Sequence, residues 1–433
     1  MKGPAKKLFA GILACLALVM LNTGNSALAE YHSGTGEGYT SGTFDTPAEA
    51  AITKTLTMPG GTETPAGSAI FVFSRVSVDD ETGTAGNMPC PANVEIEFLT
   101  TDTGSTDAGT GTKTVTKESG DVFDGVVFTH AGVYVYTVEE SSLDSFIDLV
   151  NDNTTVRETM EFSGAAYRVT AVVANEDGGS GLYMKYIAVQ QTADDEGNEI
   201  TDTVKVNSEP TGSGNGFLFT DNFNRRKLTD PTDPDANDDG FYVGNLVAGD
   251  IGDKTQYFDY AVTITAPATA ISTTYEACIT ELGNSPSTVV TDTTDNSLTN
   301  VTPGTGGYFT IASGASVTLK LKHNQRLVFT DMLVGTTYTA GETDTASGYT
   351  VAATKLQGGV SSNVTSTRTG VAGAVAESGN SVTVTNTRNS TTPTGILIDN
   401  LPFILLILVS VGGLIAYLVV RRRRPARRRI KTK

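Results

Sequence analysis

Tryptophan is absent from the 433 residues, and there are only three histidines and three cysteines. The histidines show no HExxH or Cys/His spacing, and no GxSxG turn is present. These absences give no support to a secreted hydrolase, and the sequence predicts no metal and no cofactor. Cys90 and Cys278 fall in different halves of the chain, which we assign below to different domains, so no disulfide within one domain is expected. A pair between the domains and two isolated thiols remain as alternatives.

Long uncharged apolar runs are missing except near the two ends. Three lysines precede the first run, at residues 8–21, and the small residues Ala-Leu-Ala follow at 27–29. This order is typical of a secretory signal peptide. We therefore predict that residues 1–29 are removed by cleavage between Ala29 and Glu30.

The second run, at residues 401–420, contains no charge and is followed by nine lysines and arginines. Twenty such residues in a helix span the ~30 Å hydrocarbon core of a bilayer. Because lysine and arginine beside a span stay in the cytoplasm, the rest of the chain is predicted to lie outside the cell.

The tetrapeptide Thr-Pro-Thr-Gly at 392–395 directly precedes this helix. Together with the helix and the basic tail, it resembles the sorting signal of Gram-positive surface proteins at residues 392–433. The usual family pattern is LPxTG, and this sequence is closer to the shortened PTG signals of certain pilin subunits. The resemblance implies that a sortase cleaves between Thr394 and Gly395. It also implies that the Thr394 carbonyl is transferred to an amine of another pilin subunit or of cell-wall peptide. The protein would then lie on the surface, in the wall or in a pilus of a Gram-positive bacterium.

Positive charge is scarce between these two ends. The segment from Glu30 to Thr394 keeps 18 basic and 47 acidic residues, a net charge of about −29. Such a surface argues against nucleic acid and anionic membranes as partners. It suits a solvated extracellular protein.

Alternating apolar and polar residues rich in Thr, Val, Tyr and Phe dominate this segment. Gly, Asp, Asn and Thr clusters separate the alternating stretches, which read as strands with one buried face at 69–78, 133–140, 167–173, 257–265, 316–322 and 381–387. Many short strands predict β-sandwiches. An Asp/Pro-rich stretch at 225–240 divides the chain into predicted domains at 40–224 and 241–389.

Three residues of the first predicted domain carry a family resemblance. Lys54 lies on the first strand ("AITKTL"), Glu140 ends a Y-x-V-x-E strand, and Asp221 lies in "FTDNF" near the last strand. This pattern resembles the streptococcal pilin isopeptide-linkage domain, and the two predicted domains together look like a major shaft subunit. The resemblance implies tandem Ig-like, Cna-B-type sandwiches and an amide bond from Lys54 to Asp221, promoted by Glu140.

The family pattern has asparagine where Asp221 stands. Asn222 is therefore the second candidate for the residue that bonds to Lys54. Alternation with Phe217 and Phe219 points Asp221 inward and Asn222 outward, and it likewise turns Glu139 away from the core. A lysine amine is nucleophilic only when neutral, and burial among apolar groups favours the neutral forms of both amines and carboxylic acids. We expect Phe71, Phe73, Phe128 and Phe219 to supply these apolar surroundings.

The second predicted domain departs from the pattern. Glu342 and Asn386 match the family's acid and amide, but Asn245 stands where the lysine should be, and Lys254 falls in the following turn. Without an amine on the strand, we expect this domain to fold similarly and to remain without a cross-link.

Two further sites stay open from sequence alone. Asp235, Asn237 and Asp239 have the spacing of a calcium loop, but residue 246 is leucine instead of the bidentate glutamate, which excludes an EF-hand. An irregular calcium site and a solvated acidic linker remain as alternatives. Lys205 is the candidate acceptor lysine for the Thr394 of another subunit.

The sequence thus predicts a pilin subunit that is not an enzyme acting on other molecules. The alternative is a wall-anchored adhesin that is never polymerised and binds a host or glycan ligand.

Overall fold

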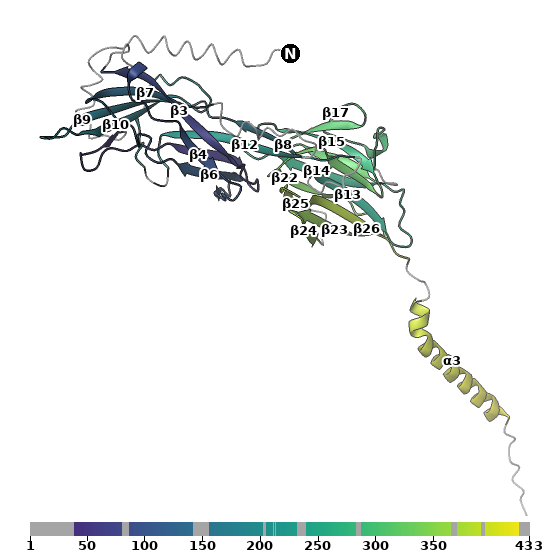
Figure 1. Cartoon of the computed structure of the whole chain (residues 1–433). Coiled ribbons are helices and arrows are strands. Elements are labelled where there is room, and N and C mark those ends of the chain that lie inside the picture. Colours follow the sequence, from purple (N-terminus) through teal and green to yellow (C-terminus); the bar gives the residue numbers. More distant parts are fainter. Residues whose placement is uncertain are drawn as a thin grey trace, which may run out of the picture.

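The computed structural model describes residues 39–79, 86–141, 156–201, 205–210, 212, 214–231, 240–282, 287–364, 370–390 and 395–423. Within these residues the regular structure is almost entirely β-strand, with one long helix at the C-terminal end. Figure 1 shows two β-rich bodies side by side, followed by the separate helix α3. The predicted fold class is confirmed.

The first body, here called the N-terminal sandwich, consists of two facing sheets. One sheet has the order β1-β10-β9-β7-β3-β4, with β11 beside β10, and contains β1 (Tyr39–Ser41), β10 (Leu182–Ala193), β9 (Ala166–Asn175), β7 (Gly132–Glu140), β3 (Gly67–Val78), β4 (Val94–Phe98) and β11 (Lys205–Val206). The other has the order β21-β12-β2-β6-β5, with β8 beside β12, and contains β21 (Asp331–Leu333), β12 (Leu218–Leu228), β2 (Thr53–Pro59), β6 (Thr112–Glu118), β5 (Ser105–Thr106) and β8 (Val156–Glu161).

The second body, the C-terminal sandwich, repeats this two-sheet plan. Its larger sheet has the order β17-β18-β15-β20-β13-β26-β23-β24, with β16 beside β15, and contains β17 (Thr302–Pro303), β18 (Tyr308–Ala312), β15 (Thr274–Glu281), β20 (Gln325–Phe329), β13 (Phe241–Ala248), β26 (Asn380–Thr387), β23 (Thr350–Gln357), β24 (Val360–Val364) and β16 (Thr288–Val289). The smaller sheet contains β19 (Ser316–Leu321), β14 (Phe258–Thr265), β22 (Thr337–Glu342) and β25 (Val371–Ala374). A short 3-10 helix, η4, spans Thr294–Asn296.

Each sandwich buries its own apolar core between its sheets. The first core is rich in aromatic side chains from both sheets, among them Phe71, Tyr134, Phe219 and Phe223. The second forms a separate cluster within the C-terminal sandwich. Because each body has its own apolar core, the two bodies are separate structural units, and both are built from two sheets.

The two sandwiches meet along β12. This strand continues past the predicted domain boundary at residue 224, and its last residues pair with β21, which comes from the second half of the chain. Arg225 Nε donates to Glu158 Oε1 at 2.6 Å, and its Nη1 donates to Glu377 Oε1 at 2.8 Å. Arg226 Nη1 lies 3.0 Å from Asp331 Oδ1. Two arginines of β12 therefore join the two acidic bodies.

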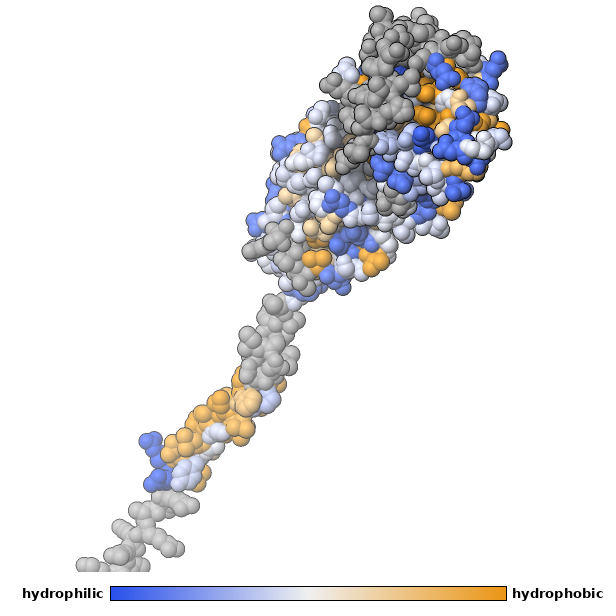
Figure 2. All heavy atoms as spheres, turned by 90° about the vertical axis from the view of Figure 1, so that its left-hand side faces the viewer, coloured by the Kyte–Doolittle hydropathy of each residue, from blue (hydrophilic) through white to orange (hydrophobic). Residues whose placement is uncertain are grey.

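Helix α3 (Gly395–Arg422) lies apart from both sandwiches. From Leu401 on, its apolar side chains are exposed, and Figure 2 shows this part as an orange rod below sandwiches whose visible face is mainly polar. Among the described residues, the stretch Leu401–Arg422 is the one helix long and apolar enough to cross a membrane. It matches the predicted span at 401–420 and could act as an anchor.

Candidate functional site

Two neighbouring strands bring Lys54 and Asp221 together. β2 and β12 are parallel, and Lys54 pairs with Phe219 while Asp221 pairs with Leu56. Because side chains alternate along a strand, Lys54 and Asp221 point to the same face, two residues apart in register. That face is the core, where both side chains are 0 % exposed.

Glu140 reaches the same point from the facing sheet. It is the last residue of β7 and pairs with Phe71 of β3. Its side chain is 2 % exposed, whereas the neighbouring Glu139 lies on the solvent side. The alternation therefore selected the correct glutamate for the buried face.

The three side chains form one hydrogen-bonded cluster, which we call the Lys54 triad. Lys54 Nζ lies 2.7 Å from both Glu140 Oε1 and Glu140 Oε2, and it also contacts Asp221 Oδ1. The backbone N–H of Ser163 donates to Asp221 Oδ1 at 2.8 Å. Asp221 Oδ2 is buried and has no hydrogen-bond partner among the described residues. Sequence reasoning missed Ser163, because a backbone donor leaves no signal in residue type.

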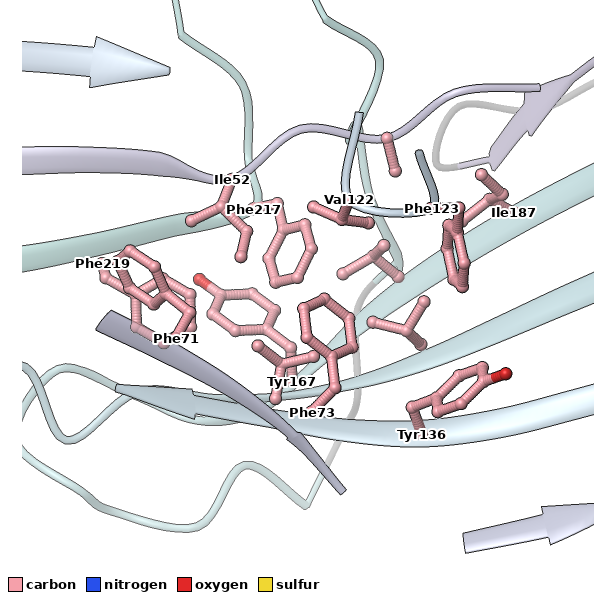
Figure 3. Packing of buried hydrophobic residues seen from close by; sticks show 14 of the residues in the cluster. Ile52, Phe71, Phe73, Val122, Phe123, Tyr136, Tyr167, Ile187, Phe217 and Phe219 are labelled. Atoms are coloured by element: carbon pink, nitrogen blue, oxygen red, sulfur yellow. The ribbon is translucent and has the colours of Figure 1, made fainter. Parts of the chain in front are cut away.

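Aromatic rings cover this cluster. The rings of Phe71 and Phe219 are 4.7 Å apart, and Tyr167 packs against Phe219 at 5.0 Å. Figure 3 shows these rings beside Ile52 and Phe217. The three polar side chains of the triad are thus 0–2 % exposed and lie among apolar rings.

Two of the four phenylalanines expected at the site lie elsewhere in the core. Phe73 packs against Phe123 and Tyr136, and Phe128 packs against Phe123 and Tyr134. Phe73 pairs with Val138, two residues before Glu140, so it shares the correct face but lies further along the strand. Tyr167 takes part in the covering instead.

Charge balance determines what the Lys54 triad can do. With all three groups ionised it would carry a net negative charge in an apolar interior, which is costly. One added proton makes it neutral overall. Moving a proton from the ammonium to a carboxylate then gives a free amine beside two carboxylic acids, the combination that amide formation requires.

The C-terminal sandwich brings Asn245, Glu342 and Asn386 together in the corresponding place. Asn386 Nδ2 donates to Glu342 Oε2 at 2.7 Å and to Asn245 Oδ1 at 3.1 Å. All three residues are buried. Tyr260, which sequence reasoning missed, donates its hydroxyl to Asn245 Oδ1 at 3.0 Å. Lys254 is exposed in the turn after β13, as expected, so no lysine lies on the strand at this site.

Burial also alters the acid of this second site. It raises the pKa of Glu342 from 4.5 to about 7, while the hydrogen bond from Asn386 opposes the rise. Because the folded state holds this proton more tightly than the unfolded chain, stability should fall as the pH rises from about 4.5 to 7. The shift corresponds to at most roughly 3 kcal/mol.

We therefore predict that the C-terminal sandwich unfolds at a lower temperature at pH 8 than at pH 5, since Glu342 is then charged in an apolar site. Calorimetry of residues 30–394 at both pH values measures this difference. The Glu342→Gln variant serves as the control, because it keeps the shape and loses the proton equilibrium. Equal pH dependence in both chains would contradict the prediction.

The remaining candidates are placed as follows. Asn222 points outward as expected, and its Nδ2 donates to Thr269 O at 3.1 Å. Lys205 lies on β11 opposite Gln190 of β10 and is partly exposed. Cys90 and Cys278 are free thiols, and burial raises the pKa of Cys278 to about 12.

Several predicted positions lie outside the described residues: Ala29, Glu30, Asp235, Asn237, Asp239 and Thr394. Gly395 is the first residue of α3. Within the described part of the chain, no group of three or more His, Cys, Asp and Glu side chains could hold a metal ion.

Comparisons with known proteins give the following similarities. A family model described as a domain of unknown function (DUF7601) matches residues 241–388. No curated protein matches the chain. Among solved structures, the major pilin from Streptococcus pyogenes is 17% identical with a TM-score of 0.31, over 79% of this chain and 99% of that chain. The pilus-presented adhesin Spy0125 (Cpa) is 13% identical with a TM-score of 0.22, over 52% of this chain and 36% of that chain.

Proposed function

We propose that this protein is a pilus-type structural subunit of a Gram-positive cell surface, stiffened by an amide bond between Lys54 and Asp221. The observation that carries the proposal is the Lys54 triad, in which an amine, a carboxyl group and a second acid are buried in contact. Such a cluster is costly as a set of ions. It is readily explained as the reactants of a condensation that the fold itself promotes.

The proposed step is a balanced loss of water. Lys54 Nζ attacks Cγ of the protonated Asp221 carboxyl group, a C–N bond forms, and the C–O bond to Oδ2 breaks. The Ser163 N–H, which donates to Oδ1, stabilises the developing negative charge on that oxygen. Oδ2, which has no partner among the described residues, leaves as the hydroxyl. Glu140 accepts the proton of the amine and supplies one to the leaving group, so it ends unchanged.

Assembly is the second part of the proposal. A sortase cleaves the precursor between Thr394 and Gly395 while α3 holds it at the membrane, and the Thr394 carbonyl is joined to Lys205 of another copy or to cell-wall peptide. Support comes from the apolar helix that directly follows the motif and from the position of Lys205 on the surface strand β11. The pilus proteins to which the chain is similar are consistent with this use.

Intact-mass measurement of recombinant residues 30–394 tests the amide bond. We expect a deficit of ~18 Da, one water, against the mass calculated from the sequence. Lys54→Ala removes the amine and Glu140→Ala the proton shuttle, so both variants should show the full mass. A wild-type chain of full mass would rule out the bond.

A further inference from the structure

The two buried polar sites are built on the same strand register. Asn386 pairs with Val247, two residues after Asn245, just as Asp221 pairs with Leu56, two residues after Lys54. On the facing sheets, Glu342 pairs with Tyr260 and Glu140 pairs with Phe71. The internal repeat therefore aligns four positions of one site with four of the other.

The two sites differ in a correlated way. Where the first has a lysine and a phenylalanine, the second has Asn245 and Tyr260. The asparagine side chain is shorter than lysine and lacks a nucleophile, and its Oδ1 accepts hydrogen bonds from both Tyr260 and Asn386. Its Nδ2 donates to Leu321 O at 3.0 Å. The asparagine side chain thus makes three of its four possible hydrogen bonds, and the hydroxyl that distinguishes tyrosine from phenylalanine supplies one of them.

We propose that residues 245 and 260 act as a pair that determines which chemistry a site of this geometry performs. Lysine with phenylalanine leads to a covalent cross-link, and asparagine with tyrosine leads to a hydrogen-bonded clamp between the first and last strands. Glu342 and Asn386 remain competent as the acid and the amide. The C-terminal sandwich is therefore an amide-forming domain arrested at these two positions.

The reaction expected after conversion is balanced. In an Asn245→Lys/Tyr260→Phe chain, the new amine attacks Cγ of Asn386, a C–N bond forms, and the bond to Nδ2 breaks. Glu342 takes a proton from the attacking amine and delivers one to the leaving group, which departs as ammonia. The amide oxygen of Asn386, which has no partner among the described residues, takes up negative charge during the attack.

This inference rests on the amide chemistry proposed for the N-terminal sandwich, and the test separates the two. In the Lys54→Met background, which removes the first amine, Asn245→Lys/Tyr260→Phe is expected to show a deficit of ~17 Da, one ammonia. Adding Glu342→Gln should restore the full mass. The matched chain Asn245→Met/Tyr260→Phe shares the added length without an amine and should also keep the full mass. The wild-type deficit of ~18 Da reports on the first site alone.

A converted chain that melts cooperatively and keeps its full mass would overturn the proposal. If the larger lysine side chain prevents the C-terminal sandwich from folding, the reverse exchange in the N-terminal sandwich tests the proposal instead. In a Lys54→Asn/Asp221→Asn chain, adding Phe71→Tyr should raise the melting temperature of the N-terminal sandwich by roughly 2–4 °C, through one new buried hydrogen bond. Phe73→Tyr in the same chain is the control and should lower it. An unchanged or lower temperature with Phe71→Tyr would refute the pairing.

Discussion

Glu140→Gln should lower the melting temperature of the N-terminal sandwich by roughly 10–20 °C. Glutamine keeps the size of the side chain but cannot shuttle the proton, so the amide bond does not form. A cross-link from residue 54 to residue 221 closes a loop long enough to restrict the unfolded chain by roughly 5 kcal/mol in the chain-entropy model. For a domain of this size, each 1 kcal/mol corresponds to about 2–4 °C. Differential scanning calorimetry measures the change directly.

Glu139→Gln provides a matched control, because it makes the same chemical change one residue away on the exposed face of β7. That variant should have the same melting temperature as the wild-type chain and keep the ~18 Da deficit. If Glu140→Gln matched Glu139→Gln in both mass and melting temperature, Glu140 would have no part in bond formation. The bond between Lys54 and Asp221 would then form without a proton shuttle from Glu140.

Thr394→Ala should abolish every high-mass, detergent-resistant form of the protein in wall extracts. The proposed sortase reaction passes through the carbonyl of this residue, and α3 would then keep the full chain at the membrane. Immunoblots of wall and membrane fractions measure the distribution. Thr391→Ala, a neighbouring threonine outside the four-residue motif, should leave it unchanged.

The acceptor is tested in the same assay. Lys205→Ala should remove the ladder of polymers and leave single subunits attached to the wall, since cleavage at Thr394 would still occur. Lys185→Ala, a change to a lysine of the adjacent strand β10, should preserve the ladder. A ladder that survives Lys205→Ala would assign polymerisation to another lysine. A single wall-bound band from the wild type would favour the adhesin alternative.

Local pattern predicted the fold class and six of the strands. The six alternating stretches chosen from sequence lie within β3, β7, β9, β14, β19 and β26, apart from one residue at an end of two of them. Alternation also chose between Asp221 and Asn222 and between Glu139 and Glu140, because a shift of one residue along a strand exchanges the buried and exposed faces. The family resemblance indicated where the side chains of the Lys54 triad lie in the sequence, and alternation chose between neighbouring residues.

Contacts between sheets could not be predicted in this way. Tyr260 looks like any other core residue of an alternating strand, and its hydroxyl gains a role only because Asn245 faces it from the other sheet. Similarly, nothing local indicates that β12 continues to Leu228 and pairs with β21, about one hundred residues further along the chain. Alternation gives the face of a residue, whereas the partner across the core depends on how two sheets are stacked.

The parallel pairing of β13 with β26 has a mechanical consequence. The chain enters the C-terminal sandwich at Phe241 and leaves it at Thr387, at opposite ends of two adjacent strands in register. Tension along the molecule would therefore load this strand pair in shear, so its hydrogen bonds must fail together instead of one by one. Once they failed, the chain between these residues could lengthen by on the order of 500 Å. A sandwich without a covalent lock would thus be stiff under small loads and a reservoir of extension under large ones, absorbing energy before any covalent link in the molecule broke.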